Sequence, residues 1–198
     1  MVQLSETTLS EREIEFNATD VHFLGPKLTL LDCTLRVRAR AKNFIVPGMR
    51  MINGRFEILS NLIDIQFDNA HFEGVTFTGK YSGIDFGSWD DSAQASIRDC
   101  DFSGAIMNGS RFRSTDISTI KLPAWPGFII KNPIAAANYV MNHKWPENLG
   151  VVLEVTCDEE PSCSGTADNA QILADADGIS LTEMRELLEP IPGMTIID

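Results

Sequence analysis

The sequence predicts a mainly β protein, in which residues 1–120 wind into stacked coils and residues 121–198 form a small acidic α+β unit. Three observations support this fold class. Side chains repeat with a period of five, Gly, Asn and Asp gather near the ends of the five-residue units, and the excess negative charge lies in the last quarter of the chain. With 43% hydrophobic and 22% charged residues among 198, the composition excludes wholesale disorder.

Nine five-residue units follow one rule: a small or apolar residue, a polar residue, a large apolar residue, and two polar residues. Residues 60–79 divide into SNLID, IQFDN, AHFEG and VTFTG, and residues 95–119 divide into ASIRD, CDFSG, AIMNG, SRFRS and TDIST. Both stretches share one frame. Residues 80–94, between them, depart from the rule, so we expect a distorted face or a protruding loop there.

A period of five excludes the two regular secondary structures as the repeating element. An α-helix with 3.6 residues per turn cannot keep one face apolar at this spacing, and a long strand alternates with a period of two. A short extended stretch followed by a corner does satisfy the pattern. The first and third positions then point inward, and Gly, Asn and Asp at the last two positions turn the chain.

These units resemble the pentapeptide-repeat family, whose unit is A-(D/N)-L-x-x. The resemblance implies a right-handed quadrilateral parallel β-helix with four units per coil. The layout of repeats followed by a compact acidic unit also resembles bacterial proteins of the toxin-immunity type. It also implies that small residues line the interior beside stacked phenylalanines, namely Phe67, Phe72, Phe77, Phe102 and Phe112. Upstream of residue 60 the repeats are degenerate, and we expect the β-helix to begin near residue 14.

Residues 121–198 show the signals of a small α+β unit that covers the open end of the β-helix. Ser180 and Glu183 form a capping-box pattern, and Gly178 is placed to end a helix. We expect strands at 127–130, 149–155 and 194–198, and helices at 133–143, 167–176 and 181–189.

Negative charge is concentrated in the C-terminal unit. Residues 1–146 hold 16 acidic and 15 basic residues, whereas residues 147–198 hold 12 acidic residues and one basic residue, Arg185. Such a segment repels nucleic acids and membrane surfaces and attracts basic partners. The alternative interpretation is a solvated surface that keeps the protein soluble. The candidate partner-binding residues are Glu154, Asp158, Glu159, Glu160, Asp175 and Asp177.

No pattern of catalytic or metal-ligating residues was found, so we predict no catalytic residue, no metal site and no cofactor. His22 and His71 occupy outward second positions of repeat units, and His143 ends a predicted helix. Cys33 and Cys100 fall on inward positions. Arg36, Arg38, Arg40 and Lys42 alternate with apolar residues and predict a cationic stripe, for which a solvated face is favoured over an anion site.

The other two cysteines, Cys157 and Cys163, have five residues between them, which is not a usual zinc spacing. Because the N-terminus lacks the layout of a secretory signal, we expect a cytoplasmic protein with free thiols. No apolar run approaches the roughly 18 residues of a membrane helix.

A rigid coil with polar outer positions suits protein recognition and supplies no pocket for catalysis. We therefore expect a non-enzymatic protein-binding inhibitor, an immunity protein that neutralises a cognate bacterial toxin through direct contact with a basic surface. The alternatives are a DNA mimic that acts on a topoisomerase such as gyrase, and a scaffold or adaptor. No direct contact with nucleic acid or membrane is expected. The sequence allows a homodimer but does not decide the oligomeric state.

Overall fold

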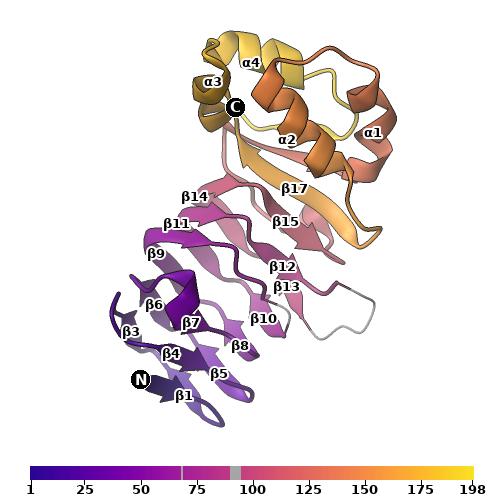
Figure 1. The fold of residues 1–198 in the computed structure, drawn as a ribbon. Coiled ribbons are helices and arrows are strands. Elements are labelled where there is room, and N and C mark those ends of the chain that lie inside the picture. The colour runs from indigo at the N-terminus through magenta and orange to yellow at the C-terminus, as the bar shows by residue number, and fades with distance from the viewer. Residues whose placement is uncertain (68, 90–94) are drawn as a thin grey trace.

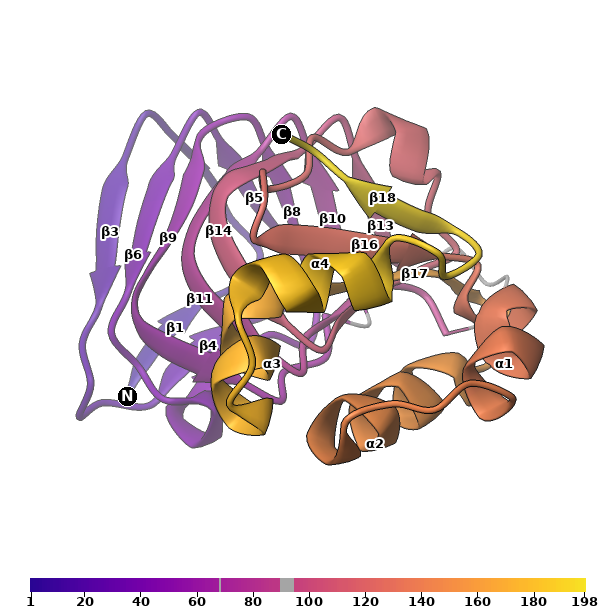
Figure 2. The same cartoon turned by 90° about the horizontal axis from the view of Figure 1, so that it is seen from above.

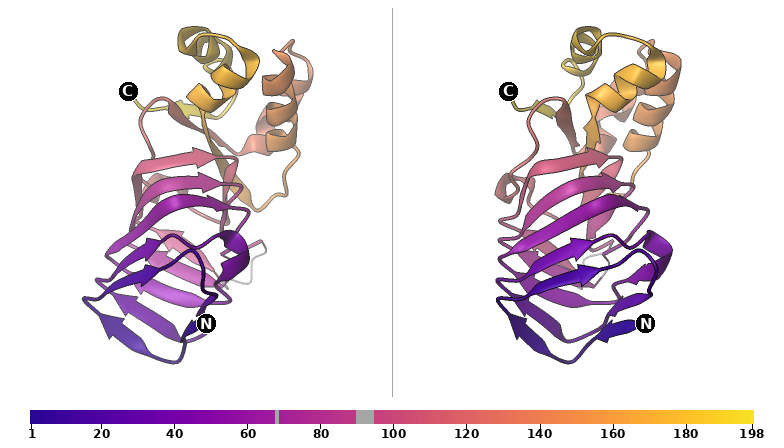
Figure 3. Two further views of the ribbon diagram at one scale, coloured as in Figure 1. Left: turned by 60° about the vertical axis from the view of Figure 1, so that its left-hand side comes forward. Right: turned by 90° about the vertical axis from the view of Figure 1, so that its left-hand side faces the viewer.

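The chain forms a parallel β-solenoid of about four turns that ends in a helix-bearing unit. The computed structural model describes residues 1–67, 69–89 and 95–198. The N-terminus lies at one end of the stack of coils, and all four α-helices lie at the opposite end (Figures 1 and 3). The predicted order, coils first and helices afterwards, is therefore observed.

Three parallel sheets form sides of the solenoid, and each of the first three coils contributes one strand to each of them. The first contains β1 (Val2–Leu4), β4 (His22–Leu24) and β7 (Phe44–Ile45). The second contains β2 (Thr8–Ser10), β5 (Leu28–Leu31), β8 (Met49–Ile52), β10 (Ala70–Glu73) and β13 (Ser96–Arg98). The third contains β3 (Glu13–Phe16), β6 (Thr34–Val37), β9 (Arg55–Ile63), β11 (Thr76–Ser82) and β14 (Asp101–Asn108). A short 3₁₀ helix, η1 (Ala41–Asn43), precedes β7.

The register between strands gives the length of each coil. Met49 pairs with Ala70, 21 positions later, and Thr34 pairs with Arg55 at the same spacing. Thr76 pairs with Asp101, 25 positions later, so this coil contains four additional residues. The four additional residues fall in the stretch that includes residues 90–94, which lie outside the described residues.

The interior of the solenoid is a stack of aromatic rings, as the repeat predicts. Phe67, Phe77, Phe102 and Phe112 are fully buried, and Phe72 is nearly so. The rings of Phe77 and Phe102 stack face to face, with centroids 4.4 Å apart. Each ring buries apolar area that contributes a few kcal/mol to folding, so the inward third positions supply most of the driving force.

Residues 80–89 continue the core, contrary to the expectation of a distorted face or protruding loop. Tyr81, Ile84 and Phe86 are fully buried, because the five-residue frame slips by one position after Gly79. In the shifted frame, Ile84-Asp-Phe86 begins a regular unit. The buried Tyr81 hydroxyl donates a hydrogen bond to the Phe56 carbonyl oxygen at 3.0 Å, which satisfies its polar atom. Only residues 90–94 of the predicted irregular stretch stay outside the described residues.

The solenoid begins at Val2 rather than near residue 14. β1, β2 and β3 form a complete first coil, in which Val2 pairs with His22 and Thr8 pairs with Thr29. The inward residues of this coil, Leu4, Leu9 and Ile14, are only partly buried because a second coil covers them on one side alone.

A mixed five-stranded sheet joins the last coil to the C-terminal unit. Its strands run in the order β12 (Asp85–Gly87), β15 (Ser110–Arg113), β17 (Cys163–Asn169), β16 (Gly127–Lys131) and β18 (Met194–Ile196). Strand β17 pairs antiparallel with β15, so it covers the edge at which parallel stacking stops. The 3₁₀ helix η2 (Ile117–Thr119) lies on the connection from β15 to β16.

The helices cover the outer face of this terminal sheet and close the solenoid, as expected (Figure 2). Ile129 and Ala167 belong to the solenoid core, whereas Phe128 and Ile130 pack in a second core among the helices. None of the helices in the described ranges is long and apolar enough to cross a membrane. The helices are α1 (Pro133–Met141), α2 (Glu147–Cys157), α3 (Ala170–Asp177) and α4 (Leu181–Leu188).

Candidate protein-binding surface

Helices α1 and α2 form an antiparallel helical hairpin, and α2 corrects the strand predicted at 149–155. Leu149, Leu153 and Cys157 recur every four residues and are buried on one side of α2, which is the spacing of a helix. Val151 and Val155 suggested a strand because β-branched residues are common in strands. Both valines are instead exposed, on the side of α2 away from the core.

The helix predicted at 167–176 is also shorter than expected. Residues 163–169 form strand β17, and α3 begins only at Ala170, where the Asn169 side chain accepts hydrogen bonds from the Gln171 and Ile172 amides. Helix α4 begins as predicted: the Ser180 hydroxyl accepts a hydrogen bond from the Glu183 amide at 3.2 Å. The expected strands at 127–130 and 194–198 are present as β16 and β18.

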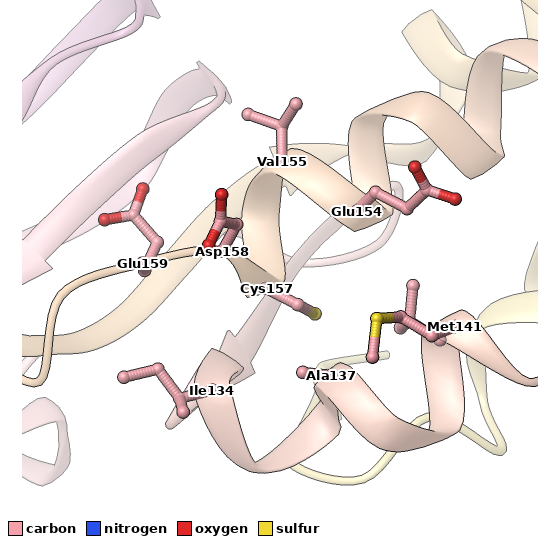
Figure 4. Close-up of a pocket in the computed structure, with 9 residues that line it drawn as sticks. Ile134, Ala137, Met141, Glu154, Val155, Cys157, Asp158 and Glu159 are labelled. Atoms are coloured by element: carbon pink, nitrogen blue, oxygen red, sulfur yellow. The ribbon is translucent and has the colours of Figure 1, made fainter.

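An open groove of about 810 Å³ lies between α1 and α2. Ala137 and Met141 of α1 extend toward Cys157 of α2 (Figure 4), and Ile134 and Val155 also line the groove, with Val155 directed away from α1. Met141 is 70% exposed and Val155 is 65% exposed, which is unusual for large apolar side chains. The groove therefore offers apolar surface that the folded chain itself leaves uncovered.

Acidic side chains border one wall of this groove. Glu154 and Asp158 line it from α2 and are exposed to solvent. Glu159 also lines it, but its carboxylate pairs with Arg111 and Arg113 and is almost wholly buried. Glu160 is exposed and lies next to the lining residues in sequence. Of the six residues predicted to bind a partner, Glu154 and Asp158 are thus both in the groove and available.

The other two predicted residues, Asp175 and Asp177, lie at the opposite end of α2. The Asp177 carboxylate accepts hydrogen bonds from the backbone amides of Asn148, at 2.9 Å, and Leu149, at 2.8 Å. These amides belong to the first turn of α2, whereas Asp158 follows its last residue, roughly 15 Å away along a helix of this length. The structure therefore does not bring Asp175 and Asp177 together with the acidic residues of the groove.

We expect Asp177→Asn to lower the free energy of unfolding by about 1 kcal/mol at pH 7, because an amide side chain has one acceptor oxygen for these two backbone N–H groups and no negative charge for the N-terminus of α2. Burial acts to raise the pKa of Asp177, but hydrogen bonds from Asn148 and Leu149 outweigh it and the net pKa is lowered. A lowered folded-state pKa gives stability that is present above the unfolded pKa and is lost as pH falls. Urea titrations at pH 7 and pH 3 measure this difference, with the exposed Asp175→Asn as the matched control; equal effects of the two variants would exclude the cap.

A buried cluster of four charged side chains fixes the loop that follows α2. Arg113 contacts Asp85 at 3.1 Å and Glu159 at 3.0 Å, and Arg111 contacts Asp85 at 2.6 Å. The side chains of Arg113 and Asp85 are 1% exposed. The ring of Trp89 lies over the Arg113 guanidinium, 3.4 Å from its centroid. The last coil thereby holds the acidic loop in one position.

The cysteine thiols show no sign of reactivity. All four cysteines are free and buried, and no two of them form a disulfide. Burial raises the pKa of Cys157 to about 11, so the thiol in the floor of the groove stays neutral at pH 7. Within residues 1–67, 69–89 and 95–198, no three His, Cys, Asp or Glu side chains gather closely enough to hold a metal ion.

The structure corrects the expectation that His22 points outward. His22 is 1% exposed, and its Nε2 lies 3.0 Å from the Asn17 carbonyl oxygen. The degenerate first coils place it inward beside Phe16, at a ring distance of 5.1 Å. His71 is partly exposed on the outer side of β10, and His143 lies two residues beyond the end of α1.

The first half of the predicted cationic stripe, Arg36 and Arg38, is neutralised by neighbouring coils, whereas Arg40 and Lys42 lie at and in η1. Arg36 contacts Glu13 at 2.9 Å and Glu57 at 3.0 Å, and Arg38 contacts Glu15 at 2.7 Å. These pairs form a ladder across β3, β6 and β9 on the solvent side. The solvated face favoured by the sequence is therefore the better interpretation.

No family model, no curated protein and no solved structure matches this chain. What the groove does is therefore inferred from its own residues. The sequence predicted its acidic side chains, but not its apolar ones. The signal was present: with 147–157 as a helix, Val151 and Val155 fall opposite the buried Leu149 and Leu153 and must face solvent.

Proposed function

We propose that this protein is a non-enzymatic inhibitor that binds another protein, and that it is an immunity protein for a cognate bacterial toxin in the cytoplasm. The main support is the groove between α1 and α2, where exposed apolar side chains lie beside Glu154 and Asp158. Helix α2, which forms one wall of the groove, belongs to a segment, residues 147–198, with 12 acidic residues and one basic residue. A surface of this kind attracts and orients a basic partner.

The proposal includes a finer description of the solenoid as a right-handed quadrilateral β-helix of the pentapeptide-repeat type. Coils of 21 residues are close to four five-residue units. One corner recurs in each coil with a positive φ, which short polar residues and glycine adopt most readily. The residues of this corner are Glu11, Asp32, Asn53, Gly74 and Asp99.

The DNA-mimic alternative receives less support from the solenoid surface. A mimic of duplex DNA needs rows of uncompensated negative charge, whereas Glu13, Glu15 and Glu57 are paired with arginines of neighbouring coils. A scaffold or adaptor would use the same groove without inhibiting its partner. The following experiment separates inhibition from mere binding.

We expect co-expression with a toxin encoded beside this gene to restore growth of cells that the toxin otherwise kills. The two proteins should also co-purify as a complex, because direct contact is the proposed mechanism. Growth curves and affinity purification measure the two outcomes. Co-purification without restored growth would favour a scaffold, and failure of both would reject the immunity function.

Charge-reversal variants test whether the acidic loop contacts the toxin. Asp158→Lys combined with Glu160→Lys should slow association about tenfold or more at low salt, and less at high salt. Both residues are exposed, so the fold is kept. Glu159 is left unchanged because its carboxylate holds the buried arginines. Asp175→Lys combined with Glu186→Lys, which reverses two exposed charges outside the groove, is the matched control.

A further inference from the structure

Two rows of exposed side chains run along the walls of the groove. On α1, Ile134, Ala137 and Met141 follow one another at helical spacing. On the other wall, Glu154 in α2 and Asp158 just after it are four positions apart, and Val155 lies next to Glu154. The hairpin is antiparallel, so Ile134 lies near Glu159 and Met141 lies near Glu154 (Figure 4). The groove is apolar along α1 and both apolar and acidic along α2.

The walls favour a helix as the occupant of this groove. Both walls are helices, whose backbone groups are satisfied internally, so the groove presents no strand edge to which an extended peptide could add. The occupant that fits such walls best satisfies its own backbone hydrogen bonds and interacts with them through side chains. A third helix does this, and its ridges pack into the groove between two neighbouring helices.

The charge of the groove selects a basic occupant. All nine lining residues are acidic or uncharged. Glu154 and Asp158 lie near the C-terminal end of α2, where the helix dipole adds further negative potential. A second copy of this chain offers no such helix from α1–α4: the one basic residue within these four helices is Arg185 of α4, and it is paired with Glu189 and Asp198.

We infer that the groove binds an amphipathic basic α-helix of the partner protein. Its apolar side chains lie between α1 and α2 against Ile134, Met141 and Val155, and its Lys or Arg side chains face Glu154 and Asp158. This inference rests on the proposed function, since it names the part of the partner that the protein recognises.

A synthetic peptide tests the inference without the toxin. The probe is a fluorescein-labelled 15-residue peptide of Leu, Ala and Lys, with Leu at positions i, i+3, i+4 and i+7 and Lys on the opposite side. Its binding to the full-length protein is followed by fluorescence anisotropy at 50 mM and 300 mM salt. We expect saturable one-to-one binding that weakens as salt rises, because charge pairs contribute to it.

Two double variants locate the binding site. Met141→Ser with Val155→Ser, and Glu154→Gln with Asp158→Asn, should each weaken binding at least tenfold at 50 mM salt. All four side chains line the groove and are exposed, so the variants keep the fold. The control is Asp175→Asn with Glu186→Gln, which removes two exposed charges outside the groove and should change affinity less than twofold.

Three results would overturn the inference: no saturable binding, equal affinity for all variants, or equal affinity for a peptide of the same composition with Leu at alternate positions. The last result would indicate an extended occupant. The growth experiment stays independent. Peptide binding without growth protection would support the helix-binding groove and reject the immunity function. Growth protection by the variant with Met141→Ser and Val155→Ser would support the immunity function and reject the groove as the site that binds the toxin.

Discussion

Replacing Asp85 with alanine is expected to lower the free energy of unfolding by about 3–5 kcal/mol, as for other buried ion pairs that lose one partner. Asp85 accepts hydrogen bonds from Arg111 and from Arg113, whose side chain is 1% exposed. In the variant, Glu159 is left as the one described carboxylate in contact with both guanidinium groups. A charge buried without its partner costs far more than the pair contributed.

Urea denaturation of the wild-type protein and the variant measures this loss. Glu15→Ala is the matched control, because Glu15 contacts Arg38 at 2.7 Å but both side chains are 53% exposed. Solvent-exposed pairs contribute about 0–1 kcal/mol, so the control should change stability little. Similar losses in the two variants would show that burial does not determine the strength of these pairs.

The inward positions of the repeat could be predicted from the sequence, since they follow from local geometry. Phe67, Phe77 and Phe102 each lie in a five-residue unit whose corner sets the direction of the side chain, and all three are fully buried. The prediction was wrong where the frame slips. Tyr81 and Phe86 lie one position earlier than the frame set by residues 60–79 requires, and a fixed period misses them.

The buried charges could not be predicted in this way. Asp85, Arg111 and Arg113 lie on the outer side of the last coils, where the repeat places solvated side chains. The loop with Glu159 and the ring of Trp89 pack over them, and the contact of Glu159 with Arg113 joins residues 46 positions apart. Local patterns contain no information on such a contact. From the sequence alone, Asp85, Arg111, Arg113 and Glu159 are therefore four unrelated charged residues on the surface.

The acidic residues of the candidate site could be predicted from the sequence, but its apolar residues could not, because they too depend on contacts between distant parts of the chain. Glu154 and Asp158 stand out through charge, which needs no structure. The apolar half of the groove depends on whether 147–157 is a helix or a strand, and local propensity favoured the wrong answer for Val151 and Val155. The packing of α2 on α1 and on the second core decides the matter, because it buries Leu149, Leu153 and Cys157 together.

The buried cluster and the groove are parts of one arrangement. Glu159 lies in the lining of the groove while its carboxylate contacts Arg111 and Arg113 of β15. The end of α2 is therefore fixed to the last coil of the solenoid, and the exposed Asp158 next to it is held in place. A binding surface that is ordered before the partner arrives loses less conformational entropy on binding.

The wild-type protein is expected to lose about 3 kcal/mol of stability between pH 4 and pH 7 through one residue, Asp168. Burial raises the pKa of Asp168 to about 7, and backbone hydrogen bonds from Gly109 and Asn169 offset this only in part. Its side chain lies on the helix side of β17, opposite Phe128. The charged form is thus held in apolar surroundings, where it is strongly disfavoured.

The sign follows from the two pKa values. The unfolded chain releases the proton near 3.8 and the folded protein releases it near 7, so the folded state holds one more proton in between. The free energy of unfolding then falls by about 1.4 kcal/mol per pH unit across this range. Asp168→Asn has no proton to release, and its stability relative to wild type should rise by the same amount from pH 4 to pH 7. Urea titrations at half-unit steps measure the difference, and Asp175→Asn, which changes an exposed carboxylate, should keep the wild-type slope. Parallel curves for wild type and Asp168→Asn would mean that Asp168 is already ionised in the folded protein.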